Sequence, residues 1–244
     1  MARFDGTDDL RRRALIQGLA AGLFSAGLSP GRAIAADIFG SRPAKLPDGQ
    51  SIYRITGDVR VNGAAATLRT RIGPTDTVET AKDAEIVFVV GESSFIQRGA
   101  SRVTLESQER GSMFISGFRL VTGALLSVFP KRRALALSTS TATIGIRGTG
   151  VYLESEPKMT YFCTCYGVAD VAATNDRESK DTVEARQHDK PLYILEGEKS
   201  GRNIRRAPFI NHTDQELMLI ETLVGRTAPF VFPKDDYIGP RRDY

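Results

Sequence analysis

The chain has 244 residues, of which 41% are hydrophobic and 25% charged, as in soluble globular proteins of one or two domains. Its 33 basic and 29 acidic residues leave a formal net charge of only +4. The basic residues are scattered and lack interleaved aromatic residues, which favours a solvated surface over a nucleic-acid interface. No P-loop, EF-hand loop or HExxH motif occurs, and no hydrolase triad is apparent. We therefore expect neither a nucleic-acid partner nor catalytic residues.

The first 35 residues have the pattern of an export signal. Three arginines at 11–13 precede a weakly apolar stretch, 14–29, and residues 33–35 form an Ala-Ile-Ala cleavage site. Arg12-Arg13 and the low hydrophobicity resemble a twin-arginine signal, the kind that exports folded proteins. The apolar stretch is shorter than the roughly 20 residues that a membrane span needs. The sequence predicts a signal peptide at 1–35 that is cleaved after Ala35, and a soluble, periplasmic mature chain without a membrane span.

A linker at 36–50, with prolines and glycines, precedes a region that predicts an all-β domain at 51–173. Glycines separate short β-rich segments at intervals of mostly about 6 to 12 residues. We expect strands at 52–55, 59–61, 67–71, 77–80, 85–90, 95–97, 102–105 and 113–116, and two more around Gly167 within 160–173. No helix-length 3.6-residue pattern occurs between residues 36 and 200, which excludes a βαβ architecture. Short strands with glycine corners favour a sandwich or a coiled, solenoid-like sheet.

The stretch 135–154, LALSTSTATIGIRGTGVYLE, predicts a strand with a corner inside the sheet. Its first half alternates small hydroxylated and apolar residues. Gly145, Gly148 and Gly150 then surround Arg147, and we expect Gly148 to adopt backbone angles closed to most residues. The run lacks the GxGxxG order and a following helix, so it does not indicate a nucleotide site.

The segment TATIGIRGTGVYLE resembles the signature of the FecR-domain family, in which a strand, an Arg-Gly-Thr corner and a further strand close the domain. Segments 55–63, 78–106 and 120–129 follow the order of that family. The resemblance spans about residues 50–173 and favours the solenoid-like form. It implies a periplasmic sensing or protein-contact module without catalytic residues, and it assigns the corner to Arg147, Gly148 and Thr149.

Regulators of this family join the domain to a cytoplasmic anti-sigma segment through a transmembrane helix. Neither feature is found in this sequence, so we do not expect the chain alone to signal across a membrane.

Residues 174–244 form an extension with loops, one helix and an irregular tail from 229. We expect a polar loop at 174–181 and a basic loop at 199–206. The helix is predicted at 213–224, where Thr213 and Glu216 form a capping box. Leu217, Ile220 and Val224 give this helix one apolar stripe, so we expect it to pack on the sheet as a lid.

Cys163, Cys165, His188 and His212 are the only cysteines and histidines of the chain. In an extended strand, a Cys-x-Cys pair projects both thiols on one face. Two cysteines and two histidines are a complete tetrahedral set for zinc or another borderline-soft metal. A carboxylate follows each histidine closely, Asp189 after His188 and Asp214 after His212, and carboxylates are the usual partners that orient a ligating imidazole.

Three other interpretations of these residues remain open. A disulfide between cysteines two apart in a strand is close to the upper Cα limit and strained. The thiols can instead be inert and buried, and the histidines can simply form hydrogen bonds in loops. The spacing of the four residues matches no standard zinc finger.

The function expected from the sequence is an exported, non-enzymatic FecR-like module that binds an envelope protein, a cell-wall component or a small signal. The alternative is a metal- or thiol-dependent periplasmic protein, with possible redox chemistry at the Cys/His set. A third interpretation is a structural envelope protein.

Overall fold

The computed structural model describes residues 44–108, 113–197 and 200–229. The expected signal peptide, most of the expected linker and the tail from residue 230 lie outside these ranges. Within them, no helix has the length and apolar character that crossing a membrane requires. Residues 44–50 contain no strand or helix, but Leu46 is buried and its backbone N–H donates to the carbonyl of Leu223 at 2.9 Å.

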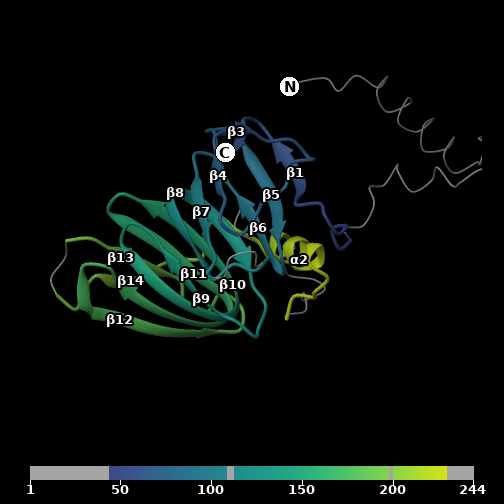
Figure 1. Ribbon diagram of the computed structural model, residues 1–244. Helices are drawn as coiled ribbons and strands as arrows, with labels where there is room; N and C mark the ends of the chain where they lie inside the picture. Colours follow the sequence, from purple (N-terminus) through teal and green to yellow (C-terminus); the bar gives the residue numbers. More distant parts are fainter. Residues whose placement is uncertain (1–43, 109–112, 198–199, 230–244) are drawn as a thin grey trace, which may run out of the picture. The chain divides into compact units, whose positions relative to one another are not determined.

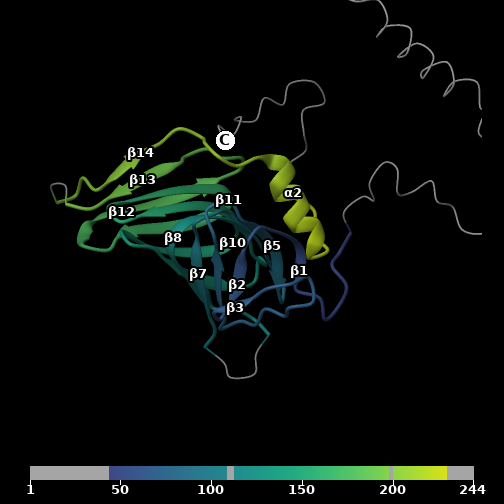
Figure 2. The same ribbon diagram turned by 90° about the horizontal axis from the view of Figure 1, so that it is seen from above.

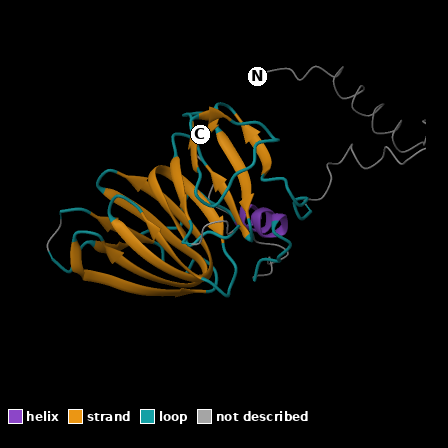
Figure 3. Cartoon of the chain, viewed as in Figure 1, coloured by secondary structure: helices purple, strands orange, loops and turns teal. Residues whose placement is uncertain are grey.

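The expected all-β class with one C-terminal helix is confirmed (Figures 1 and 3). In the described part of the chain, fourteen strands form one sheet, and the helix α2 (Asp214–Leu223) follows them. The strands are β1 (Ile52–Thr56), β2 (Val59–Val61), β3 (Ala64–Ala65), β4 (Thr77–Thr80), β5 (Glu85–Val90), β6 (Ser93–Gln97), β7 (Arg102–Glu106), β8 (Gly117–Val128), β9 (Ala134–Ser138), β10 (Ala142–Glu156), β11 (Met159–Ala173), β12 (Asp176–Ala185), β13 (Leu192–Leu195) and β14 (Ile204–Arg206).

The long strands change partners along their length, so the sheet branches. The main order is β14-β13-β11-β10-β9-β8-β7-β4-β2-β3, while β12 lies beside β11, and β1, β5 and β6 join through β8. Pairing is antiparallel between the described neighbours except for β8 and β9, which run parallel. The three strands β12, β13 and β14 therefore extend the same sheet that begins at β1.

The two faces of the sheet carry separate hydrophobic clusters, because successive side chains of a strand point to opposite faces. Val151 of β10 and Phe162 of β11 belong to the inner cluster, which gathers residues from nearly every strand. Their chain neighbours Tyr152, Tyr161 and Cys163 belong to the outer cluster, together with the apolar residues of α2. The face on which Cys163 lies is therefore the face that the helix covers.

The expected corner in 135–154 is a β-bulge within the continuous strand β10, and not a turn between two strands. Residues 148–149 of β10 lie opposite the single residue Gly167 of β11. The extra residue changes which side chains of β10 point to the inner cluster. These are even-numbered residues such as Ile146 before the bulge and odd-numbered residues such as Val151 after it. At the same point β10 changes its partner from β9 to β8.

Gly148 has the backbone conformation that the sequence predicts. Its φ of +58° lies in the left-handed region. A Cβ at this position would lie 2.3 Å from Cα of Lys131, a backbone atom that cannot move aside cheaply. The bulge therefore requires glycine for two reasons, conformation and space.

Several of the expected elements are wrong. Residues 67–71 form a turn, in which the Thr70 hydroxyl accepts from the N–H of Thr67 at 2.9 Å, and residues 113–116 precede β8 without joining a strand. Residues 160–173 lie in the single strand β11 instead of two. The expected loop 174–181 is a tight turn followed by β12, whose charged outer side chains leave little hydrophobic pattern to detect. The expected loop 199–206 ends in the strand β14, which pairs with β13 and has two basic residues among its three.

The expected lid helix is present and packs on β6 and β8. Figure 2 shows the helix α2 near the part of the sheet that contains β1 and β5. Thr213 caps it, and Glu216 completes the capping box by accepting from the Thr213 N–H at 3.1 Å. Leu217 and Ile220 are buried as predicted, while Leu223 takes the most buried position of the last turn and Val224 is only partly buried.

Candidate metal centre

The two cysteines project from the outer face of β11, as their spacing predicts. Cys163 and Cys165 are fully buried and both have free thiols. Tyr161 precedes them on the same face, and Tyr152 of the neighbouring strand is the cross-strand partner of Cys163. The outer face of this strand pair therefore forms the base of the site.

The two histidines reach this base from separate loops. His188 follows β12 with a positive φ of 52°, and its backbone N–H donates to the Cys165 carbonyl at 3.0 Å. His212 lies two residues before α2, and its ring stacks on Tyr152 with centroids 4.4 Å apart. Each histidine is therefore fixed to the β10–β11 pair by a contact other than its ring nitrogens.

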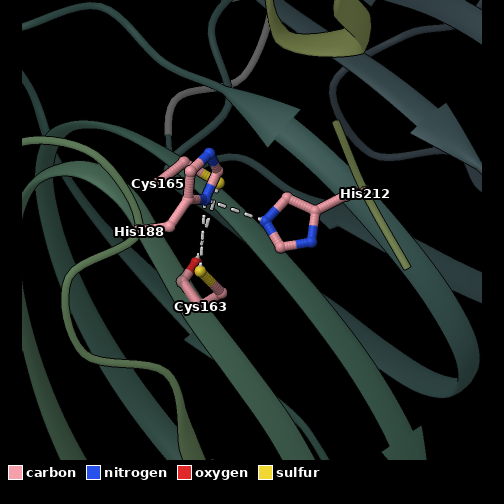
Figure 4. Close-up of side chains that lie close together, drawn as sticks. All are labelled: Cys163, Cys165, His188 and His212. Atoms are coloured by element: carbon pink, nitrogen blue, oxygen red, sulfur yellow. Dashed lines mark hydrogen bonds between the residues drawn. The ribbon is translucent and has the colours of Figure 1, made fainter. Parts of the chain in front are cut away.

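The four side chains converge on one point (Figure 4). One ligand atom from each of Cys163, Cys165, His188 and His212 lies within 4.8 Å of all the others. His188 Nδ1 is 3.5 Å from Cys163 Sγ and 3.1 Å from His212 Nε2. The structure thus brings together the complete Cys/His set that the sequence singled out.

The outward-facing ring nitrogens have partners, although not the expected ones. His188 Nε2 donates to Asp214 Oδ1 at 2.8 Å, and His212 Nδ1 donates to the Ile210 carbonyl at 2.7 Å. Asp189, which the sequence suggested for His188, instead accepts from the backbone N–H groups of residues 186 and 187. The assignment of Asp189 to His188 and of Asp214 to His212 is therefore wrong, because the loop geometry turns the Asp189 carboxylate back on its own backbone.

Gln187 is a further member of the site that sequence reasoning missed. Its Nε2 donates to Asp214 Oδ2 at 2.7 Å, so both carboxylate oxygens of Asp214 are occupied. Asp214 is buried and opens α2, where the positive end of the helix favours an anion. The helix therefore holds the carboxylate that orients His188.

These outer bonds fix the state of the inner nitrogens. A carbonyl and a carboxylate can only accept, so His212 Nδ1 and His188 Nε2 carry the ring hydrogens. In neutral rings the inward nitrogens then present two lone pairs only 3.1 Å apart. Such an arrangement requires a cation, either a proton or a metal ion, between them.

The pKa shifts of the two cysteines and the two histidines indicate how these side chains would be protonated without a metal ion. Burial raises the pKa of Cys163, but the Cys165 thiol and both imidazoles outweigh it and hold that pKa well below its usual range. Burial lowers the pKa of His188, yet Cys163 and Asp214 raise it overall. Burial and the Cys163 thiolate raise the pKa of Cys165, and burial lowers the pKa of His212. Without a metal, one proton on His188 would face the Cys163 thiolate.

The geometry also fits a four-coordinate metal. Ligands in a tetrahedral zinc site, with bonds of about 2.0 Å to nitrogen and about 2.3 Å to sulfur, are separated by about 3.3 Å between nitrogens and about 3.5 Å between nitrogen and sulfur. The two inward ring nitrogens are 3.1 Å apart and His188 Nδ1 is 3.5 Å from Cys163 Sγ, while all pairs of the four ligand atoms lie within 4.8 Å. A metal ion can therefore enter with small adjustments of the side chains.

The corner residues lie outside this cluster. Arg147 is exposed and pairs with Asp170 at 3.0 Å, and Thr149 is buried within the bulge. Gly148 and Thr149 are the two residues of β10 that lie opposite Gly167 of β11 in the bulge. A Cβ on Gly167 would approach the Thr149 methyl group to 2.4 Å, so the two strands are in close contact there. The register between β10 and β11 shifts at Gly148 and Thr149.

Comparison with known proteins gives few matches. Neither a protein-family model nor a curated protein matches the chain. Two crystal structures of a "putative anti-sigma factor" from Parabacteroides distasonis ATCC 8503 are similar to part of it. The first is 10% identical, with a TM-score of 0.42, and the match covers 60% of this chain and 74% of that one. The second is 12% identical, with a TM-score of 0.41, and covers 67% and 82%. A likeness at this level assigns no function to the chain.

Proposed function

We propose that the chain is a metal-binding β-module of the cell envelope that holds one zinc-type ion between Cys163, Cys165, His188 and His212. The observation that carries this proposal is the convergence of one ligand atom from each of the four residues within 4.8 Å. In both imidazoles, the ring nitrogen that points away from the cluster donates a hydrogen bond to an oxygen of the protein, which is the usual arrangement of ligating histidines.

Burial argues against thiol chemistry as the role of the cysteines. A reactive cysteine needs an accessible thiolate, whereas Cys163 and Cys165 are 0% exposed. A disulfide between them would be strained at this spacing, and it would leave the two inward nitrogens facing each other. A shared metal ion satisfies the thiolates and the nitrogens together.

The ligand set also indicates the metal and its role. Two thiolates and two imidazoles suit zinc or another borderline-soft ion, and they suit magnesium or calcium poorly. Four protein ligands leave no position for a substrate or an activated water, and such closed sites are structural. The metal would therefore join β11, the loop after β12 and the approach to α2, and the protein would act by binding and not by catalysis.

The proposed setting is the periplasm, with the FecR resemblance as its basis. The twin-arginine pattern would export the chain already folded, so a metal loaded in the reducing cytoplasm would protect both thiolates before they met an oxidant. We propose that the binding partner of the module is an envelope protein or a cell-wall component.

The metal content of the purified mature protein tests this proposal. Inductively coupled plasma mass spectrometry should find one zinc per chain, directly or after zinc is added under reducing conditions. Cys163→Ser and His212→Gln should each lower the metal content. Thr164→Val is the matched control, because Thr164 lies between the two cysteines, and its buried hydroxyl has no hydrogen-bond partner among the described residues. Equal metal content in wild type and Cys163→Ser would refute the proposal.

A further inference from the structure

The segment that carries His212 covers the outer face of the sheet. We call residues 207–224 the lid: they comprise the irregular stretch 207–213, α2 and its C-cap residue Val224. Its apolar side chains that join the outer cluster are Ala207, Phe209, Ile210, Leu217, Leu219, Ile220, Leu223 and Val224. They lie over sheet residues that include Val87, Ile96, Leu126, Val128, Tyr152 and Tyr161.

The C-terminal end of the lid is held without the metal ligands. The buried hydroxyl of Tyr166 is bonded to the carboxylate of Glu221, and Arg226 Nε lies 2.5 Å from the other oxygen of that carboxylate. The Leu46 N–H donates to the carbonyl of Leu223. These contacts anchor the last turn of α2 to the strand β11 and to the segment before β1.

The middle of the lid has one ion pair of its own. Arg98 bridges Glu216 of α2, at 2.7 Å, and Glu85 of β5. Both carboxylates are largely covered, with side-chain exposures of 17% and 21%. This bridge also leaves the metal ligands untouched.

The N-terminal end depends on the Cys/His set. His212 and Asp214 both belong to the lid, and both are buried against residues of the sheet and of the loop at 186–190. The other polar contacts of this end are single hydrogen bonds. Tyr161 donates to the Pro208 carbonyl at 2.9 Å and accepts from the Ile210 N–H at 3.3 Å, and Asn211 donates to Glu154 at 2.7 Å. The Ala207 N–H donates to the Pro191 carbonyl at 2.9 Å. Such bonds contribute far less than a four-ligand metal site.

We infer that metal occupancy controls whether the N-terminal half of the lid, residues 207–213, closes on the outer face. This inference rests on the proposed metal site. Without the ion, the closed lid would bury His212 and Asp214 against the two thiols and His188 with no metal to bind the converging ligand atoms, which penalises the closed state. The stretch 207–213 would then move away from the sheet, while the contacts of Glu216 and Glu221 hold α2 in place. This movement would expose the rings of Tyr152 and Tyr161 and the two cysteines.

Hydrogen–deuterium exchange of the purified mature protein, with zinc and after removal of zinc by a chelator, tests whether the metal controls closure of the lid. If free zinc is present at about 100 times the dissociation constant, the open state is suppressed about a hundredfold. Amides at 207–213 and 186–190 should therefore exchange about a hundredfold faster in the metal-free protein. Amides of β5 and β6 should not change, and renewed addition of zinc should restore protection.

Each other outcome has a distinct meaning. If zinc binds and its removal leaves exchange unchanged everywhere, the lid inference is wrong while the metal site stands. If exchange accelerates equally in β5 and β6, the metal supports the whole fold, and a local lid is likewise ruled out. If no zinc binds at all, the proposed function is wrong, and the lid inference, which rests on it, is wrong as well.

Discussion

His188 Nδ1 and His212 Nε2 lie 3.1 Å apart, and each imidazole is bonded on its far side to a group that can only accept a hydrogen bond. The two residues are 24 positions apart in the chain and come from different loops. Their approach accompanies the packing of α2 on the outer face of the sheet, since the residues before the helix place His212 on Tyr152, the cross-strand partner of Cys163. The short distance between the two ring nitrogens, and the hydrogen bonds that hold each ring, indicate which substitutions should affect the site.

Asp214→Asn should weaken zinc binding without removing a ligand. The carboxylate accepts from His188 Nε2 at 2.8 Å and orients the ring, and loss of such a partner typically costs about 10–100-fold in metal affinity. Competition with a chromophoric chelator measures this affinity. Asp189→Asn is the matched control, because Asp189 contacts backbone N–H groups and not a ring nitrogen. An Asp214→Asn protein with wild-type affinity would show that the carboxylate does not support the site.

Gly148→Val should destabilise the fold by about 1–3 kcal/mol, the range of strained-backbone sites. The φ of +58° disfavours a branched side chain, and a Cβ would collide with the backbone of Lys131. Chemical denaturation of the metal-loaded protein measures the free energy of unfolding. Gly145→Ala, in the same strand, is the control, since a Cβ there meets no atom within 4 Å. Equal losses in both variants would show that the bulge is not a special position.

Asp176→Asn should make the protein less stable at neutral pH, and the difference from wild type should vanish in acid. Asp176 accepts hydrogen bonds from side chains or N–H groups of Glu178, Ser179, Ser200, Gly201 and Asn203. The hydrogen bond from Ser179, with those from Asn203 and Gly201, holds the pKa of Asp176 well below its usual range, against the effect of burial.

The sign of this effect follows from linkage. A carboxylate whose pKa is lower in the folded state stabilises the fold above its unfolded pKa of about 3.9, and this contribution is lost as the pH falls. Thermal unfolding at pH 7 and at successively lower pH, with wild type and variant in parallel, checks it. A melting-temperature difference that is constant across this range would contradict the role assigned to the charge.

Changing Arg12 and Arg13 together to Lys should keep the precursor in the cytoplasm. The paired arginines before a weakly apolar stretch indicate the folded-protein export route. Cell fractionation with an antibody against the mature chain measures the distribution. Normal export of the double variant, or export that stops only when the general secretion channel is blocked, would show that the chain uses another route.

The elements that were predictable from the sequence are those with a local signal. The capping box of Thr213 and Glu216 fixed the start of α2, and glycine spacing with short β-rich segments indicated the all-β class. The four metal-ligand candidates could be found by composition alone, because the chain has no other cysteine or histidine.

The parts that could not be predicted depend on contacts between distant residues. Asp214 orients His188 although the two residues are 26 positions apart in the chain. No local pattern shows that this partner is Asp214 and not Asp189, which directly follows His188 in the sequence. The first part of β12, residues 176–181, was expected as a loop because all of its side chains are polar or charged, including the buried Asp176 and Ser179. The bulge at Gly148 was expected as a corner, since three nearby glycines permit either geometry.

X-ray absorption at the zinc K edge of the purified, zinc-loaded mature protein tests the central claim most directly. If Cys163, Cys165, His188 and His212 bind the ion, the spectrum should fit two sulfur ligands at about 2.3 Å and two nitrogen ligands at about 2.0 Å. A first shell of only oxygen and nitrogen ligands, with no sulfur at that distance, would contradict the account.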